Sequence, residues 1–63
     1  MADSVTVSAV EDGTRLLRWF GRNFPSMPHR EFYRLCRGGQ LRVNSARCRG
    51  TEVLHTGDVI RIP

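Results

Sequence analysis

Arginine is the residue type in this sequence with the strongest capacity for molecular recognition. All ten basic residues are arginines, against six acidic residues, and the net charge is +4. A guanidinium group is planar and presents a fork of donors that fits phosphate oxygens and also stacks on bases. The composition therefore favours a polyanionic partner, although a GC-rich genome would produce the same bias without any function.

The arginines recur at helical spacing in two separate stretches. Arg30, Arg34 and Arg37 fall at i, i+4 and i+7, so they share one face of an expected helix. A second stripe with similar spacing lies earlier in the chain and consists of Arg15, Arg18 and Arg22. One stripe alone is often no more than a solvated charged face, but its repetition favours a binding surface.

Other reactive groups lack the spacing that catalysis or metal binding needs. Cys36 and Cys48 are 12 positions apart, and His29 and His55 are too far apart for the usual zinc spacing, so we expect no metal. The thiols are expected to be reduced and packed in the core. No Ser/His/Asp group, glycine-rich phosphate loop or carboxylate pair occurs. We therefore predict neither catalytic residues nor a cofactor in these 63 residues, which leave no room for a deep cleft.

Two short helices are expected to carry the arginine stripes. Thr14 is placed to cap a first helix over residues 15–24, with Leu16, Phe20, Phe24 and Trp19 on its core face. A second helix is predicted from Pro28 to Arg37 and ends at Gly38 or Gly39, where a left-handed residue can close it. Its core stripe contains Phe32, Leu35 and Cys36.

Alternating apolar and polar residues predict short strands around these helices. The first strand is expected over Val5–Val10, and Leu41–Val43 and Arg47-Cys48 form a hairpin around Asn44-Ser45. Residues 51–54 continue the pattern, and Val59–Ile62 forms the last strand. The predicted class is α+β in the order β-α-α-β-β-β, with two helices packed on a small, mostly antiparallel sheet.

Three phrases of the sequence resemble the S4 RNA-binding domain, which has the alpha-L fold. They are Arg15-Leu16-x-x-x-Phe20, Arg34-Leu35-x-x-Gly38-Gly39-x-Leu41-x-Val43-Asn44, and Leu54-x-x-Gly57-Asp58-x-Ile60. The N-terminal S4 domain of bacterial large-subunit ribosomal RNA pseudouridine synthases is the most similar form, over roughly residues 5 to 63. The resemblance implies a surface that grips structured RNA, with large-subunit rRNA as the partner.

The resemblance also implies which side chains contact RNA. They are Arg15, Arg18, Arg30, Arg34, Arg37, Arg42, Asn44 and Arg47. Asn44 has an alternative role as a turn former. Trp19 and Tyr33 either stack on bases or pack in the core, and Arg61 is placed to pair with Glu52 on a neighbouring strand.

The expected organisation is one S4-like RNA-binding domain over residues 1–63, monomeric and cytoplasmic, with no apolar run long enough to span a membrane. This domain would be the N-terminal piece of a longer isomerase whose catalytic domain follows Pro63. The alternatives are a stand-alone, ribosome-associated S4 protein or, less favoured because of its proline-rich connector, a helix-turn-helix DNA reader. A β-grasp sulfur carrier would need a C-terminal Gly-Gly, whereas Gly38-Gly39 is internal.

Overall fold

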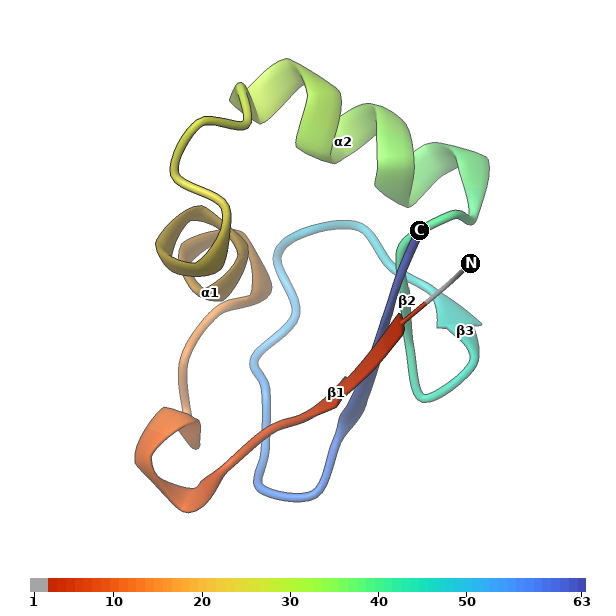
Figure 1. Cartoon of the computed structure of the whole chain (residues 1–63). Coiled ribbons are helices and arrows are strands. Elements are labelled where there is room, and N and C mark those ends of the chain that lie inside the picture. The colour runs from red at the N-terminus through yellow and green to blue at the C-terminus, as the bar shows by residue number, and fades with distance from the viewer. Residues whose placement is uncertain (1–2) are drawn as a thin grey trace.

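The computed structural model describes residues 3–63, and they form an α+β domain (Figure 1). This confirms the expected structural class. In chain order the elements are β1 (Asp3–Thr6), the 3₁₀ helix η1 (Ala9–Glu11), α1 (Leu16–Asn23), α2 (His29–Gly38), β2 (Arg42–Val43), β3 (Ala46–Arg47) and β4 (Val59–Ile62).

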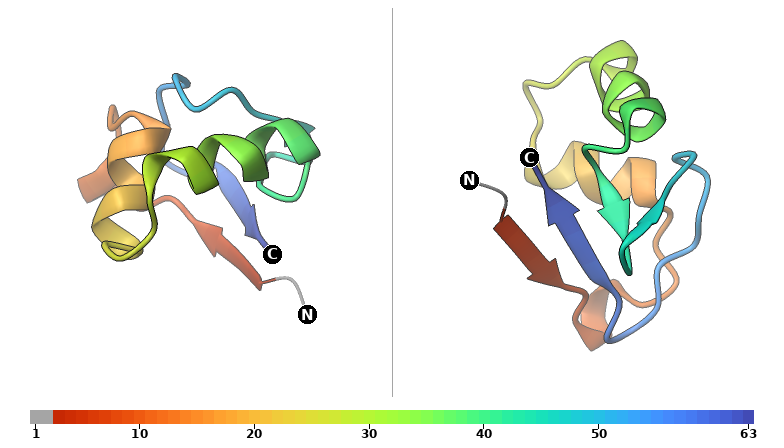
Figure 2. Two further views of the ribbon diagram at one scale, coloured as in Figure 1. Left: turned by 90° about the horizontal axis from the view of Figure 1, so that it is seen from above. Right: turned by 90° about the vertical axis from the view of Figure 1, so that its right-hand side faces the viewer.

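The four strands form one antiparallel sheet in the order β1-β4-β2-β3. Strand β1 pairs with β4 from Asp3 opposite Ile62 to Thr6 opposite Val59, so the first and last strands are neighbours. Strand β2 lies on the other side of β4, with Val43 opposite Ile60. When the sheet faces the viewer, α1 lies behind it and α2 lies beyond its upper end (Figure 2).

Aromatic side chains join the two helices in a single core. Phe20 of α1 and Phe32 of α2 pack with their ring centroids 4.9 Å apart, and both rings are buried. The remaining buried apolar residues come from every layer and are Val7, Leu16, Trp19, Cys36, Leu41, Cys48, Leu54 and Ile60. Burial of Phe32 and Cys36 confirms the predicted core face of α2, although Leu35 is only half-buried at its edge.

The first strand is shorter than predicted, and the expectation of a strand to Val10 is wrong. The chain turns into η1 because Glu11 Oε1 accepts hydrogen bonds from the backbone N–H (3.1 Å) and the hydroxyl (3.2 Å) of Ser8. Glu11 Oε2 also accepts a bond of 2.8 Å from the indole Nε1 of Trp19. This local capping box competes with strand pairing and redirects the chain toward α1.

The predicted Thr14 cap and the predicted strand over residues 51–54 are both wrong, for one reason. The first N–H groups of α1 are bonded by backbone carbonyls rather than by a side chain: Leu16 N–H donates to Glu52 O at 2.8 Å and Leu17 N–H to Gly50 O at 3.2 Å. Residues 50–54 therefore run alongside the start of α1, and an antiparallel β-bridge pairs Arg15 with Val53. A non-local segment satisfies the donors that every helix N-terminus leaves open.

The hairpin and the end of α2 follow the sequence expectations. Gly39 has φ of +74° and closes α2 in the left-handed conformation, with its N–H donating to Cys36 O at 3.2 Å. Asn44 and Ser45 both have positive φ, +52° and +67°, as a two-residue hairpin turn requires. The returning strand is Ala46–Arg47, one residue earlier than predicted.

Candidate functional site

Three arginines lie on and just before α1, and all are directed away from its buried residues. Arg15, Arg18 and Arg22 are exposed, whereas Leu16 and Phe20 are buried. The three arginines line a shallow concavity of about 360 Å³ together with Gly13 and Thr14. Arg15 is tied down, because its Nη1 donates to Thr51 O at 3.1 Å.

Arginines of α2 are likewise directed to solvent. Arg30, Arg34 and Arg37 are all exposed. Arg34 forms an ion pair with Glu31 one turn earlier, with 3.4 Å between Nη1 and Oε2. Such an exposed pair contributes little to stability, so a phosphate can displace the carboxylate at small cost.

The segment Cys48–Thr51 lies between the two helical sets. Gly50 contacts α1 through the bond from Leu17 N–H, and it lies so close to α2 that a Cβ there would be 2.9 Å from Cε1 of Tyr33. The segment therefore contacts both helices, and it continues directly from the hairpin. We call the combined set the arginine surface: Arg15, Arg18, Arg22, Arg30, Arg34, Arg37, Arg47 and Arg49.

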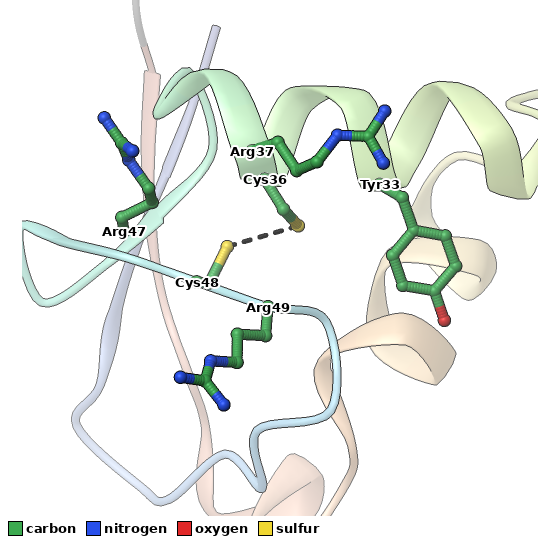
Figure 3. Close-up of a pocket in the computed structure, with 6 residues that line it drawn as sticks. All are labelled: Tyr33, Cys36, Arg37, Arg47, Cys48 and Arg49. Carbon is green, nitrogen blue, oxygen red and sulfur yellow. Dashed lines mark hydrogen bonds between the residues drawn. The ribbon is translucent and has the colours of Figure 1, made fainter.

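An open pocket of about 550 Å³ lies within the arginine surface, between α2 and the chain after β3 (Figure 3). We call it the arginine pocket; its lining is Tyr33, Cys36, Arg37, Arg47, Cys48 and Arg49. The two cysteines point toward one another from opposite walls, with the charged side chains around them. It combines an apolar base with a cationic rim.

The cysteines of this pocket are neutral packing groups, as the sequence predicts. Both are buried free thiols with 3.3 Å between their sulfur atoms, and Cys48 donates to Leu41 O at 3.2 Å. Burial raises the pKa of the Cys36 thiol to about 12 and also raises the pKa of Cys48. A thiol that stays protonated at neutral pH is a poor nucleophile and a poor metal ligand.

Two of the predicted contact residues in the hairpin already bond to neighbouring parts of the fold. Arg42 is half-buried, and its Nε donates to Gly39 O at 2.7 Å, which fastens β2 to the end of α2. Asn44 Oδ1 accepts from Val59 N–H at 2.9 Å, and its Nδ2 donates to Asp58 Oδ1 at 3.0 Å. Both side chains therefore fasten the hairpin that carries Arg47 to its neighbours.

Arg49 was missed by the sequence analysis, although a signal for it exists. Side chains alternate between the two faces of an extended chain, so a buried Cys48 places both neighbours outward. Arg47 and Arg49 are indeed exposed on either side of it. A pattern of arginine, apolar residue and arginine after a hairpin turn is the feature to search for.

The expected ion pair between Arg61 and Glu52 is wrong. Glu52 instead accepts hydrogen bonds from the backbone N–H groups of Arg49 at 2.6 Å and Gly50 at 2.8 Å. Burial acts to raise the pKa of this carboxyl group, but the two N–H donors dominate and lower it. Arg61 lies on β4 opposite Arg42, away from Glu52.

The two aromatic candidates have different positions. Trp19 is 1% exposed and bonded to Glu11, so stacking on a base is excluded and the core interpretation is confirmed. Tyr33 is half-buried at the wall of the arginine pocket, with its ring edge-on to Phe32 at 5.2 Å. Tyr33 alone of the two has a ring that a ligand can reach.

Over residues 3–63, neither α-helix is long and apolar enough to cross a lipid bilayer. Nor does this part of the chain bring three or more His, Cys, Asp or Glu side chains together as a metal ion would require.

Comparison with known proteins shows similarity to ribosomal large subunit pseudouridine synthases. The relatives are named ribosomal large subunit pseudouridine synthase C and match over 59 residues, with 37% identity in Haemophilus influenzae, 36% in Yersinia pestis and 34% in Escherichia coli. The match covers 94% of this chain but only 18% of each relative, so the chain spans about a fifth of their length. No protein-family model matches the chain.

Proposed function

We propose that this chain is the S4-like RNA-binding module of a large-subunit rRNA pseudouridine synthase. It would dock the enzyme on structured rRNA through the arginine surface, and the isomerase chemistry would reside in a catalytic domain that follows the module. The similarity supports this division, since the relatives are more than five times longer than the matched region.

One observation carries the proposal: most of the guanidinium groups are not used by the fold. Among residues 3–63, only Arg15, Arg34 and Arg42 make a side-chain hydrogen bond or an ion pair, which leaves seven arginines available. Free guanidinium groups gathered across two helices and a hairpin can each contact a phosphate of a folded RNA. Within the predicted set, Arg18, Arg30, Arg37 and Arg47 are proposed as direct contacts, with Arg15 and Arg34 beside them. Arg42 and Asn44 hold the hairpin in place.

The test is the salt dependence of binding to a structured large-subunit rRNA fragment. Arg18→Ala removes one phosphate contact, so the slope of log K against log salt should become shallower by roughly 0.7–0.9, and affinity should fall at low salt. Arg61→Ala is the matched control, because it changes the net charge equally from strand β4, outside the arginine surface, and should leave the slope nearly unchanged.

Equal losses in the two variants would mean that the positive charge acts only as a diffuse field, and the arginine surface would not be the RNA contact. Equal competition by a DNA duplex of the same length would favour the helix-turn-helix alternative instead. A 63-residue chain that binds neither nucleic acid would contradict the proposed function.

A further inference from the structure

The arginine pocket has features that phosphate binding alone does not explain. A surface that only tracks an RNA backbone needs exposed cations, yet here three arginines and a tyrosine surround a depression whose base is two protonated thiols. Its volume of about 550 Å³ lies within the range of small-ligand sites, roughly 300–1,000 Å³. The pocket is therefore large enough for a group the size of one nucleotide.

The ring of Tyr33 is held in a fixed orientation at the wall of this pocket. Phe32 packs edge-on against it at an angle of 70°, and Gly50 lies under it so closely that no side chain fits between them. A ring supported in this way loses little freedom when a planar group packs against it. Stacking of a base on an aromatic side chain is sequence-tolerant, because every base has a flat face.

The charged rim fits the anionic part of the same ligand. The guanidinium groups of Arg37, Arg47 and Arg49 make no hydrogen bond or ion pair with any other residue between positions 3 and 63. They extend from two different walls, Arg37 from α2 and the other two from the chain at β3 and just beyond. Phosphates on both sides of one nucleotide can therefore each meet an arginine.

A paired base cannot use this site, because in a duplex both of its faces are covered by neighbouring bases. Proteins that read single bases of RNA act on loops and bulges, where an unstacked base can leave the helix. We propose, building on the proposed RNA-binding function, that the arginine pocket receives one unpaired nucleotide of the bound RNA. The nucleobase lies against the ring of Tyr33 and the floor of the pocket, which Cys36 and Cys48 form. The phosphates on either side of this nucleotide contact Arg37, Arg47 and Arg49.

The experiment compares two RNA hairpins with the same closing loop, one with a fully paired stem and one whose stem carries a single-nucleotide bulge. The 63-residue chain should bind the bulged hairpin more tightly, by roughly 5-fold to 100-fold, as expected for one base stacked on one aromatic ring. Tyr33→Leu should abolish this preference and leave affinity for the paired hairpin unchanged. Tyr33→Phe is the matched control, because it keeps the ring and should keep the preference.

A second variant keeps the test valid if Tyr33→Leu disturbs the fold. Arg49→Gln alters an exposed side chain without a bonding partner and should weaken the bulged complex more than the paired complex. The nuclear magnetic resonance signals of the Tyr33 ring should move upfield only with the bulged RNA, since a stacked base shields them.

The outcomes separate this inference from the proposed function. Equal affinity of the unmodified chain for both hairpins, or a bulge preference that persists in Tyr33→Leu, would overturn the nucleotide pocket and leave RNA binding intact. Failure to bind either hairpin would overturn both.

Discussion

The turn region of this molecule and its arginine surface use charge in opposite ways. The turn region comprises residues 8–12 and 55–58, which lie side by side at the bottom of Figure 1. There, Asp12 accepts from the N–H of Thr56 at 2.7 Å, and Asp58 accepts from the N–H of His55 at 2.9 Å. On the arginine surface, in contrast, most charged groups bond to nothing within the described chain.

Hydrogen bonds lower the pKa of the carboxyl groups in the turn region. Backbone and side-chain donors of Thr56 hold the pKa of Asp12 below its ordinary value, and the amide of Asn44 does the same for Asp58. The N–H of Ser8 lowers the pKa of Glu11. The folded chain therefore stabilises the charged form of these three carboxyl groups.

The difference indicates which charges serve structure and which are available for a partner. Four of the six carboxylates accept backbone N–H bonds in loops, namely Glu11, Asp12, Glu52 and Asp58. These four carboxylates close loops and form no ion pair with an arginine among residues 3–63. Two arginines still lie near enough to act on them, because Arg22 helps to lower the pKa of Glu11 and Arg49 that of Glu52. Most of the acidic side chains are therefore used by the fold, whereas most of the arginine side chains are not.

The largest expected effect on the free energy of unfolding comes from Gly50. Its segment contacts both helices that carry the arginine surface, but it is held by a carboxylate, as the turn region is. Gly50 supports the arginine surface, yet Glu52 bonds to its N–H as carboxylates do in the turn region. Its φ is +105°, and a Cβ would lie 2.7 Å from Phe32 Cε2. Gly50→Ala should therefore cost roughly 2–4 kcal/mol, through backbone strain and overpacking together, as measured by urea unfolding.

Gly21→Ala provides the matched control for that variant. Gly21 lies within α1, where a Cβ meets nothing within 4 Å, so alanine should stabilise the chain by about 0.5–1 kcal/mol. A domain this small has a stability of only about 3–5 kcal/mol, so the two variants should differ clearly. If Gly50→Ala unfolds like the parent, the segment is not the support that the contacts indicate.

Local patterns made much of this fold predictable. The left-handed Gly39 and the positive φ of Asn44 both follow from residue type, and the arginine stripes follow from helical spacing. What could not be predicted depends on contacts between distant positions. The carbonyls of Gly50 and Glu52 bond to the first N–H groups of α1, and no periodicity within either segment reveals that partnership.

The candidate site was predictable to the same extent. Spacing places Arg18 and Arg37 on exposed helix faces, but it does not show that Cys36 and Cys48 approach to 3.3 Å and form the base of a pocket. Nor does it show that the amide of Asn44 is already occupied by Asp58 and Val59. Side-chain type indicates what a residue can bind, and only the fold shows what it has already bound.

The next largest effect is the loss of thermal stability at acidic pH, where the carboxylates that accept backbone hydrogen bonds become protonated. A carboxyl group whose pKa is lowered in the folded chain contributes stability that is present above its unfolded pKa and is lost as the pH falls through the folded pKa. The ordinary pKa is 4.5 for Glu11 and Glu52 and 3.8 for Asp12 and Asp58, and the fold lowers all four. The melting temperature, followed by circular dichroism, should hold to about pH 5 and then fall steadily toward pH 3.

A double variant sharpens the acid experiment. Glu11→Gln with Asp58→Asn removes two of the titrating carboxylates, so the melting temperature should start lower at pH 7 and fall less on acidification. A parent chain whose melting temperature is constant down to pH 3 would show that the carboxylates of the turn region do not stabilise the fold.

The smallest expected effects on the free energy of unfolding come from replacing single arginines, and they distinguish arginines that the fold uses from those that it does not. Arg18→Ala and Arg30→Ala remove exposed side chains that have no bonding partner in the described chain, so each should change the free energy of unfolding by less than about 0.5 kcal/mol. Arg42→Ala removes the half-buried bond to Gly39 O and should cost about 1 kcal/mol. Urea unfolding with replicate measurements resolves these values. Equal costs for Arg18→Ala and Arg42→Ala would mean that the fold uses both side chains alike. Near-zero cost at Arg18, together with a shallower salt slope for RNA, would show that its charge serves a partner and not the fold.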